Sequence, residues 1–314
     1  MPAETVSLRF VFRAIAMVEL LTIMEHEKLW EKHGVDVQFD FSKGPLECEE
    51  RLFSGDVDFI LGNHVTPYMR LAQGHPMVCL AQSVNYDHLW LATRPETTEL
   101  PTLTGGCIVG RPLIRPDGAF NGHDTLTRGL FLRMQGVDIF KLTWLDGLGR
   151  GSSAAFDAVL NRDADACFIN PRGADAAREA GLTIHEFPPF PMIHNLTLTS
   201  MLPWVQREPE TAKRVIRVIM DATDYFVANR EETLDMLRNP VHPLPEGYAD
   251  DLAERYDERI EEYSRTLFPE PEAIVNVHRL STMVYPEAER VNPLELWDLR
   301  LLREVHLERK QSTA

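Results

Sequence analysis

The sequence of 314 residues predicts an α/β fold of two lobes followed by a helical C-terminal region. Helical and strand patterns alternate from residue 18 to residue 169, as they do in α/β proteins with buried strands. The alternation pauses near Pro101 and then starts again, which indicates a second lobe that repeats the first. The length agrees with this organisation, because a typical domain has about 150 residues.

The first lobe begins with a helical pattern over residues 18–31, which His33 and Gly34 close. Residues 35–41 then alternate between apolar and polar side chains, as a half-buried strand does. The remaining elements expected in this lobe are a helix over 46–53, a strand over 57–61, a helix over 67–72 and a strand over 77–81.

The second lobe is expected to contain strands over 107–110, 142–145 and 166–169 and helices over 124–135 and 153–160. We assign residues 1–96 and 189–240 to lobe 1 and residues 97–188 to lobe 2, inserted into it. Amphipathic periodicity returns in two later segments, at Val215, Ile219, Ala222 and Phe226 and at Leu252, Tyr256, Ile260, Tyr263 and Leu267. Residues 241–314 are therefore expected to form a helical region that packs on lobe 1.

An internal repeat connects the two lobes. The segment GDVDFILGN at 55–63 is echoed by RDADACFIN at 162–170, and each is a helix end, an acidic turn and a buried strand that leads to Asn63 or Asn170. Ligands of open α/β sheets bind beyond the carboxyl ends of the strands. Two such edges that face one another would form an interlobe cleft for a ligand.

Composition narrows the range of partners. The formal net charge is −16, and 44% of the residues are hydrophobic. Such a charge repels phosphate backbones and anionic lipid headgroups, so we expect neither nucleic acid nor a membrane surface as a partner. No window reaches the ~18 apolar residues of a membrane span, so no membrane insertion is expected. Homo-oligomer formation stays open.

The first residues do not resemble a secretory leader, because Arg9 and Arg13 interrupt the apolar stretch from Val6 to Val18. The four cysteines lie far apart, and three of them are in apolar runs, as buried thiols are. The sequence therefore predicts a cytoplasmic location.

Several segments resemble known families. The units GDVDF and LTGGCIVG, separated by the crossover at 89–93, resemble type II periplasmic-binding-protein folds over about residues 6–230. The segment EKLWEKHGVDVQF is similar to solute-binding proteins related to the thiamine-pyrimidine precursor synthases. The segments RGLFLRMQGVDIFKLTW, FPMIHNLTLTSMLPWVQREPETAKRVI and EPEAIVNVHRL resemble the 4,5-dihydroxyphthalate decarboxylase group. The cysteine run of the synthases is absent, and His64 lacks a preceding lysine.

The resemblance implies two functions. The first is a cytoplasmic, cofactor-independent lyase that decarboxylates a small, hydroxylated aromatic carboxylate, for which His194 or His64 would supply the proton. The second is a substrate-binding protein of an ABC-type importer that binds a small organic anion without chemistry. For His64, His123 and His194 the alternative is a structural role in a hinge or core hydrogen bond, and Asp124 has a simpler role as a helix N-cap.

A small organic anion in an acidic protein needs a local positive site, and arginine grips a carboxylate with two parallel hydrogen bonds. Arg172, which follows a strand and a proline, is the main predicted anchor. The further predicted ligand-binding residues are Arg111, Asn63, Asn170, His123, Ser152, Ser153 and Arg13. Ser152 and Ser153 end a glycine-rich turn that lacks the P-loop lysine. No metal is predicted, because Trp30 breaks the H-E-x-x-H spacing that begins at His26. A metal site assembled from residues far apart in the sequence stays open.

Overall fold

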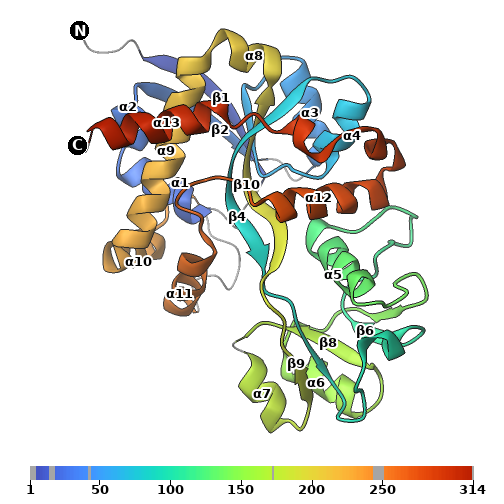
Figure 1. Cartoon of the computed structure of the whole chain (residues 1–314). Helices are drawn as coiled ribbons and strands as arrows, with labels where there is room; N and C mark the ends of the chain where they lie inside the picture. The colour runs from blue at the N-terminus through green and yellow to red at the C-terminus, as the bar shows by residue number, and fades with distance from the viewer. Residues whose placement is uncertain (1–4, 14–17, 42–43, 172, 243–250, 313–314) are drawn as a thin grey trace. The chain divides into compact units, whose positions relative to one another are not determined.

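The computed structural model describes residues 5–13, 18–41, 44–171, 173–242 and 251–312. The chain forms two compact units (Figure 1). Unit 1 comprises Met1–Asn85 and Met192–Ala314, and unit 2 comprises Tyr86–Pro191. Each unit is built around its own five-stranded sheet.

The sheet of unit 1 has the strand order β2-β1-β3-β10-β4. These strands are β1 (Val6–Phe12), β2 (Val35–Phe41), β3 (Phe59–Leu61), β4 (Met77–Asp87) and β10 (Phe190–Met201). β1 pairs in parallel with β2 and β3, so the carboxyl ends of these three strands meet at one edge. β10 runs antiparallel to β3, with Leu198 opposite Leu61.

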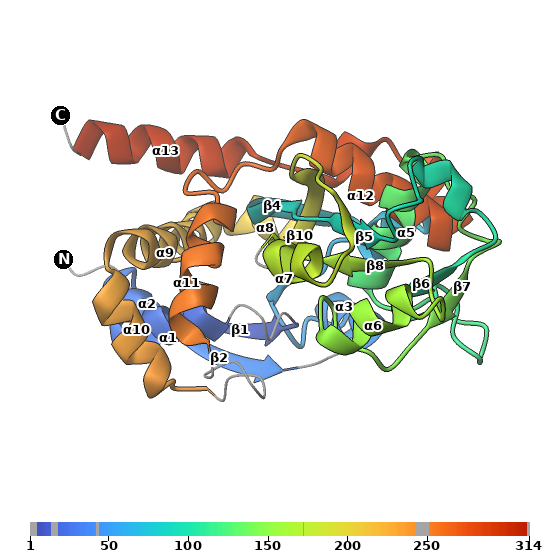
Figure 2. The ribbon, with the colours of Figure 1, turned by 90° about the horizontal axis from the view of Figure 1, so that it is seen from below.

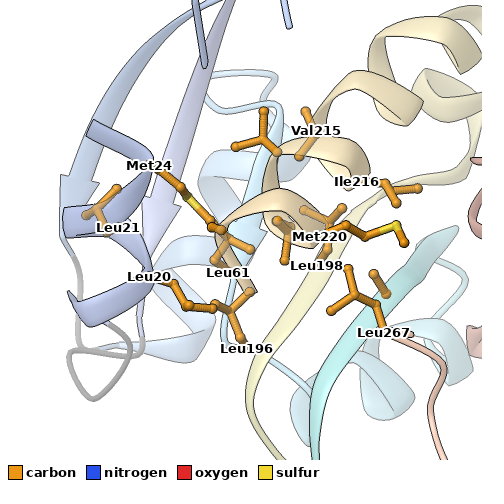
Figure 3. Packing of buried hydrophobic residues seen from close by; sticks show 14 of the residues in the cluster. Leu20, Leu21, Met24, Leu61, Leu196, Leu198, Val215, Ile216, Met220 and Leu267 are labelled. Atoms are coloured by element: carbon orange, nitrogen blue, oxygen red, sulfur yellow. The ribbon is translucent and has the colours of Figure 1, made fainter. Parts of the chain in front are cut away.

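The helices of unit 1 bury apolar side chains in the core of the unit. They are α1 (Val18–His26), α2 (Leu29–Lys32), α3 (Pro45–Phe53), α4 (Thr66–Ala72), α8 (Leu202–Arg207), α9 (Pro209–Ala228), α10 (Arg230–Arg238), α11 (Leu252–Glu262), α12 (Pro271–Val284) and α13 (Arg300–Ser312), with short 3₁₀ turns η3 (Pro286–Arg290) and η4 (Pro293–Leu296). Figure 3 shows Leu20 of α1, Met220 of α9 and Leu61 and Leu198 of the strands in one packed cluster, and each of these side chains is buried.

The C-terminal helix α13 packs against α9 and crosses it in the view of Figure 1, and Figure 2 shows the two helices in neighbouring layers. Lys213 of α9 is largely buried and forms ion pairs with Glu308 at 2.9 Å and Glu304 at 3.6 Å, both on α13. Residues after 241 that the structure describes therefore belong to unit 1.

The sheet of unit 2 has the order β7-β6-β8-β5-β9. Its strands are β5 (Trp90–Thr93), β6 (Cys107–Val109), β7 (Thr143–Leu145), β8 (Ala166–Ile169) and β9 (Thr183–His185). β6 pairs in parallel with β7 and β8, whereas β5 is antiparallel to β8 and β9. The helices are η2 (Leu100–Leu103), α5 (His123–Met134), α6 (Ser153–Leu160) and α7 (Gly173–Glu179).

Some boundaries differ from those expected. The unit boundaries fall after residues 85 and 191 rather than after 96 and 188, because β5 pairs with β8 and β9 in the sheet of unit 2. The helix expected over 18–31 is two helices, since Lys28 adopts a left-handed conformation with φ of 50°. Helix α11 ends at Glu262, so Leu267 lies outside it.

In the described parts of the chain, no helix is long and apolar enough to cross a membrane.

Candidate functional site

The internal repeat of the sequence is also a repeat of hydrogen bonds. In unit 1, the Asp58 carboxylate accepts a hydrogen bond from the Arg9 amide at 2.9 Å, and the Asp58 amide donates to the Arg9 carbonyl at 2.8 Å. In unit 2, Asp165 and Cys107 make the same two contacts, both at 2.7 Å. Each aspartate thereby ties its strand to the neighbouring strand, and an asparagine follows at the carboxyl end.

The carboxyl edge of unit 1 contains a buried polar network around Glu49. The Glu49 side chain on α3 is 0% exposed and accepts hydrogen bonds from Asn63 Nδ2 at 2.7 Å and from Arg70 Nε at 2.7 Å. Thr66 donates to the same carboxylate. Because a buried carboxylate needs partners that replace water, these contacts fix the orientation of the Asn63 amide.

Arg13, the residue after β1, completes this network. Its Nη1 atom donates to Asn63 Oδ1 at 3.0 Å and to the Gly62 carbonyl at 3.4 Å. Burial lowers the pKa of Arg13, whereas the nearby Cys48 and Glu49 act in the opposite direction. The two predicted ligand-binding residues Arg13 and Asn63 thus contact each other. The Asn63 side chain forms its hydrogen bonds with Arg13, Glu49 and Thr66.

The strands β4 and β10 contribute a second polar group to unit 1. Gln82 is 0% exposed; its Nε2 atom donates to the His194 carbonyl at 2.7 Å, and its Oε1 atom accepts from the Thr197 hydroxyl at 2.5 Å. The same hydroxyl lies 3.5 Å from His64 Nδ1. Ser83 donates to the Leu196 carbonyl at 3.2 Å.

The two predicted proton donors have different positions in this group. His64 is 7% exposed and lies beside Thr197. His194 is half-buried in β10, where its carbonyl is held by Gln82. Both belong to unit 1, and their assignment as proton donors stays a prediction.

The carboxyl edge of the unit 2 sheet carries three arginines, whereas the corresponding edge of unit 1 carries the network around Glu49. Arg111 follows β6 and Gly110, Arg150 lies in the turn before α6, and Arg128 lies on α5. Arg150 Nη2 donates to the carbonyls of His88 at 2.7 Å and Ile169 at 3.2 Å. Arg128 lies over the ring of Phe168 at 5.6 Å.

Arg128 is the most desolvated of the three. Burial lowers its pKa, repulsion from Arg150 and Arg111 lowers it further, and Asp124 and Asp87 partly offset this. Within the described residues its Nε atom is buried and has no hydrogen-bond partner. A buried donor without a partner costs free energy, so an anion at this position would stabilise the site.

The remaining residues predicted in unit 2 lie at helix starts. Ser152 is the N-cap of α6 and accepts a hydrogen bond from the Ala155 amide at 3.1 Å, and Ser153 is exposed in the first turn. Asn170 Oδ1 accepts from the Gly173 amide at 2.9 Å. His123 begins α5 beside Thr127, with 3.3 Å between Nε2 and the hydroxyl.

Two of the expectations for this unit change or fall outside the structure. Gly122, not Asp124, is the N-cap of α5, and Asp124 lies in the first turn. Arg172 lies outside the described residues.

Sequence reasoning missed Glu49 and Arg128. For Arg128 a signal existed in the sequence, since it lies within the apolar segment LTRGLFL. Its neighbours Thr127 and Gly129 are buried.

The described residues contain no group of three or more His, Cys, Asp or Glu side chains that could hold a metal ion.

Solved structures with similar folds identify the architecture. The periplasmic aliphatic sulphonate binding protein SsuA from Escherichia coli has a TM-score of 0.58 at 14% identity, covering 92% of this chain and 90% of its own. A putative periplasmic sulfonate-binding protein from Methylobacillus flagellatus has a TM-score of 0.62 at 13% identity, covering 98% and 96%. The periplasmic nitrate-binding protein NrtA from Synechocystis has a TM-score of 0.54 at 12% identity, covering 97% and 89%.

The fold is that of the periplasmic binding proteins. The two-lobed α/β fold class expected from the sequence is thus confirmed. No family model and no curated protein matches the chain, so a particular branch of periplasmic-binding-protein-like proteins is not assigned.

Two sequence-based expectations change with this comparison. The predicted cytoplasmic location is contradicted, because three of the matched proteins with this fold, the two sulfonate-binding proteins and NrtA, are described as periplasmic. The predicted decarboxylase activity has no support among the matched structures, whereas the alternative of a binding protein has such support.

Proposed function

We propose that this chain is a substrate-binding protein of an ABC-type importer, that it works in the periplasm, and that its ligand is a small organic anion. The arginine cluster of unit 2, defined as Arg111, Arg128 and Arg150, is the observation that carries the proposal. The cluster lies at the carboxyl edge of the unit 2 sheet, and ligands of α/β sheets bind beyond the carboxyl ends of the parallel strands.

The cluster is unusual within this acidic protein. Many other arginines pair with a carboxylate, as Arg94 does with Asp165 at 2.7 Å and Arg115 with Asp117 at 2.8 Å. In the described residues, no ion pair within 4.0 Å joins Arg111, Arg128 or Arg150 to a carboxylate. Three neighbouring cations repel one another, and this repulsion is relieved when an anion binds.

The chemistry of the cluster favours a sulfonate or a carboxylate. Guanidinium groups donate paired hydrogen bonds to such oxygens, and these charge-assisted bonds are stronger than neutral ones. The sulfonate-binding proteins with the same fold support this ligand class.

The test is isothermal titration calorimetry of the purified protein with ethanesulfonate, isethionate, benzoate and phthalate. The wild type is expected to bind at least one of these anions. Arg128→Met is expected to weaken that binding by about 10- to 100-fold, since it removes a charge-assisted hydrogen bond. Methionine keeps an apolar stem against Phe168 and relieves the repulsion, so the variant should fold normally.

Arg115→Met is the matched control, because Arg115 is an exposed arginine of the same unit that already pairs with Asp117. Its affinity for the anions should equal that of the wild type. An equal loss of affinity in both variants would mean that the effect comes from the overall charge of the protein, and it would contradict the proposed site. Each carboxylate that binds is then incubated with the protein, and release of carbon dioxide would favour the decarboxylase over the binding protein.

A further inference from the structure

We propose that Trp144 of unit 2 is a ligand-binding residue whose ring packs against the organic part of the anion, so that the protein prefers aryl sulfonates or aryl carboxylates over short alkyl ones. The inference deepens the proposed function and rests on it. It uses residues of unit 2 alone.

The register of the sheet places Trp144 on the same face as Phe168. Ile108 of β6 pairs with Trp144 of β7 on one side and with Ala166 of β8 on the other. Residues that are paired in a parallel sheet point to one face, and so does every second residue along a strand. Trp144 therefore shares its face with Phe168, two residues after Ala166.

The two faces of this sheet are covered by different helices. Cys167 and Ile169, on the opposite face, pack into a core cluster with side chains of α6 and α7. Phe168 instead contacts Phe131 of α5, with 6.3 Å between the ring centroids. The face that carries Trp144 is therefore the one on which α5 packs, and α5 also carries Arg128 of the arginine cluster.

A glycine leaves space beside the Trp144 ring. Continuing the pairing of Val109 with Cys167 by one residue puts Gly110 level with Phe168. A Cβ atom at Gly110 would lie 3.5 Å from Cε3 of Trp144, and within the described residues only atoms of this ring, apart from the chain neighbours of the glycine, come within 4 Å of that position. Between Trp144 and Phe168, β6 thus contributes no side chain.

The charged groups of the arginine cluster adjoin this space. Arg111 is the residue after Gly110, and the Arg128 guanidinium lies over the Phe168 ring at 5.6 Å. Neighbouring strands are about 4.8 Å apart, so β7 and β8, on either side of β6, are separated by about 10 Å. A phenyl group on an anion held at Arg128 extends farther toward Trp144 than an ethyl group does, and so fills more of this interval.

The Trp144 ring has apolar surface to offer a ligand. It is half-buried on β7, the edge strand of the sheet. An aromatic ring that covers it removes apolar surface from water and adds a favourable ring contact. Trp90, the other tryptophan of unit 2, has a structural role, because its Nε1 atom donates to the Phe187 carbonyl at 3.1 Å.

The experiment measures the affinity of benzenesulfonate relative to that of ethanesulfonate by calorimetry at one pH and one salt concentration. The two anions carry the same charged group and differ in the apolar group. We expect the wild type to bind benzenesulfonate about 10-fold more tightly, the value of one aromatic contact with its buried area. Trp144→Ala should reduce this ratio to about 2 or less and leave the affinity for ethanesulfonate within about 2-fold, since the arginine cluster is unchanged.

Two further variants separate recognition from general effects. Trp144→Phe keeps an aromatic ring on the strand and should retain most of the preference. Phe140→Ala is the matched control, because Phe140 is an aromatic residue of the same unit that is 61% exposed in the turn leading into the amino end of β7. It should keep the wild-type ratio.

Fluorescence gives a direct readout of the contact. The chain has five tryptophans, and an aryl ring against Trp144 should change the emission when benzenesulfonate is added to the wild type. The change should be absent in Trp144→Phe, although calorimetry still shows binding. Because phenylalanine suits a strand, this variant decides the question if Trp144→Ala folds poorly.

The outcomes distinguish this inference from the proposed function. If the wild type binds the two sulfonates equally, or if Trp144→Ala keeps the preference, the role of Trp144 is wrong and the binding protein stands. A fluorescence change that persists in Trp144→Phe would also contradict it. If the wild type binds none of the sulfonates or carboxylates, the proposed function fails and the inference fails with it.

Discussion

Asn63 and Asn170 occupy equivalent places in the repeat, at the carboxyl end of a buried strand, and yet their surroundings differ. Asn63 of unit 1 is 1% exposed and bonds Glu49, Arg13 and Thr66. Asn170 of unit 2 is half-buried, and its side chain accepts from the start of α7. In unit 1 the charges at this edge neutralise each other inside the protein, whereas in unit 2 the arginine cluster keeps its charge available.

The difference shows how one backbone pattern can serve two purposes. The aspartate contacts, Asp58 with Arg9 and Asp165 with Cys107, fix the strands in both units. The residues added from neighbouring helices then decide the chemistry of the edge. These are Glu49 and Arg70 in unit 1 and Arg128 in unit 2.

Glu49→Ala should give the largest effect and tests whether the edge of unit 1 is held together by its ionic network. Removal of one partner of a buried ion pair leaves Arg70 Nε and Asn63 Nδ2 without their acceptor. We therefore expect a loss of about 3–5 kcal/mol in the free energy of unfolding. Urea denaturation measures it. Glu50→Ala is the control, because Glu50 pairs with the same Arg70 at 2.8 Å but is exposed, and it should cost less than about 1 kcal/mol. Equal losses would contradict the network.

Asp165→Asn tests whether the aspartate contact of unit 2 depends on charge more than that of unit 1. Burial acts to raise the pKa of Asp165, but the Cys107 amide and Arg94 at 2.7 Å outweigh it and leave the pKa below its ordinary value of 3.8. Asp165 accepts from Arg94 with Oδ1 and from Cys107 with Oδ2. Asparagine keeps only one acceptor oxygen and loses the charge, so we expect a cost of about 1–3 kcal/mol at neutral pH. Asp58→Asn should cost less, because Arg9 Nε lies 3.9 Å away.

The same aspartate predicts a pH dependence. Its folded pKa is depressed, so its contribution to stability is present above the unfolded pKa near 3.8 and is lost as the pH falls through the lower folded value. Denaturation of the wild type and of Asp165→Asn between pH 6 and pH 3 measures this contribution. The difference between the two should shrink below about pH 4, and a constant difference would contradict the assignment.

Gly55→Ala and Arg162→Gly should give the smallest effects and test whether the repeat extends to its first residue. Gly55 has a φ of 73° and Arg162 a φ of 69° at equivalent positions. Alanine at 55 has open space, so its cost of about 1 kcal/mol is purely conformational. Glycine at 162 should stabilise or leave stability unchanged within about 1 kcal/mol. Thermal unfolding should show a lower melting temperature for Gly55→Ala and an equal or higher one for Arg162→Gly. A lower melting temperature for both variants would contradict the equivalence.

Most elements could be predicted from local sequence. The strand over 35–41, the helix over 153–160 and the strand over 166–169 have the expected bounds, because apolar periodicity reports burial directly. The short strand β5 was placed in the wrong lobe, since its partners β8 and β9 are more than 70 residues away. Strand pairing at that distance leaves no local pattern.

The candidate site was only partly accessible to such reasoning. Arg111 and Arg13 were selected because they follow strands, and the structure places each at a sheet edge. Arg128 and Glu49 lie on helices, where a charged residue resembles any surface residue until the helix is packed.

By itself the sequence determined the α/β class, the two repeated units and the polar residues at their strand ends, because hydrophobic periodicity and turn residues are local properties of the chain. The tertiary structure alone decided which charges are neutralised and which stay available. Arg13 and Arg128 are the same residue type, but one shares Asn63 with a buried carboxylate and the other lies beside two more arginines. The charge that a side chain meets depends on neighbours distant in sequence, and only folding brings them together.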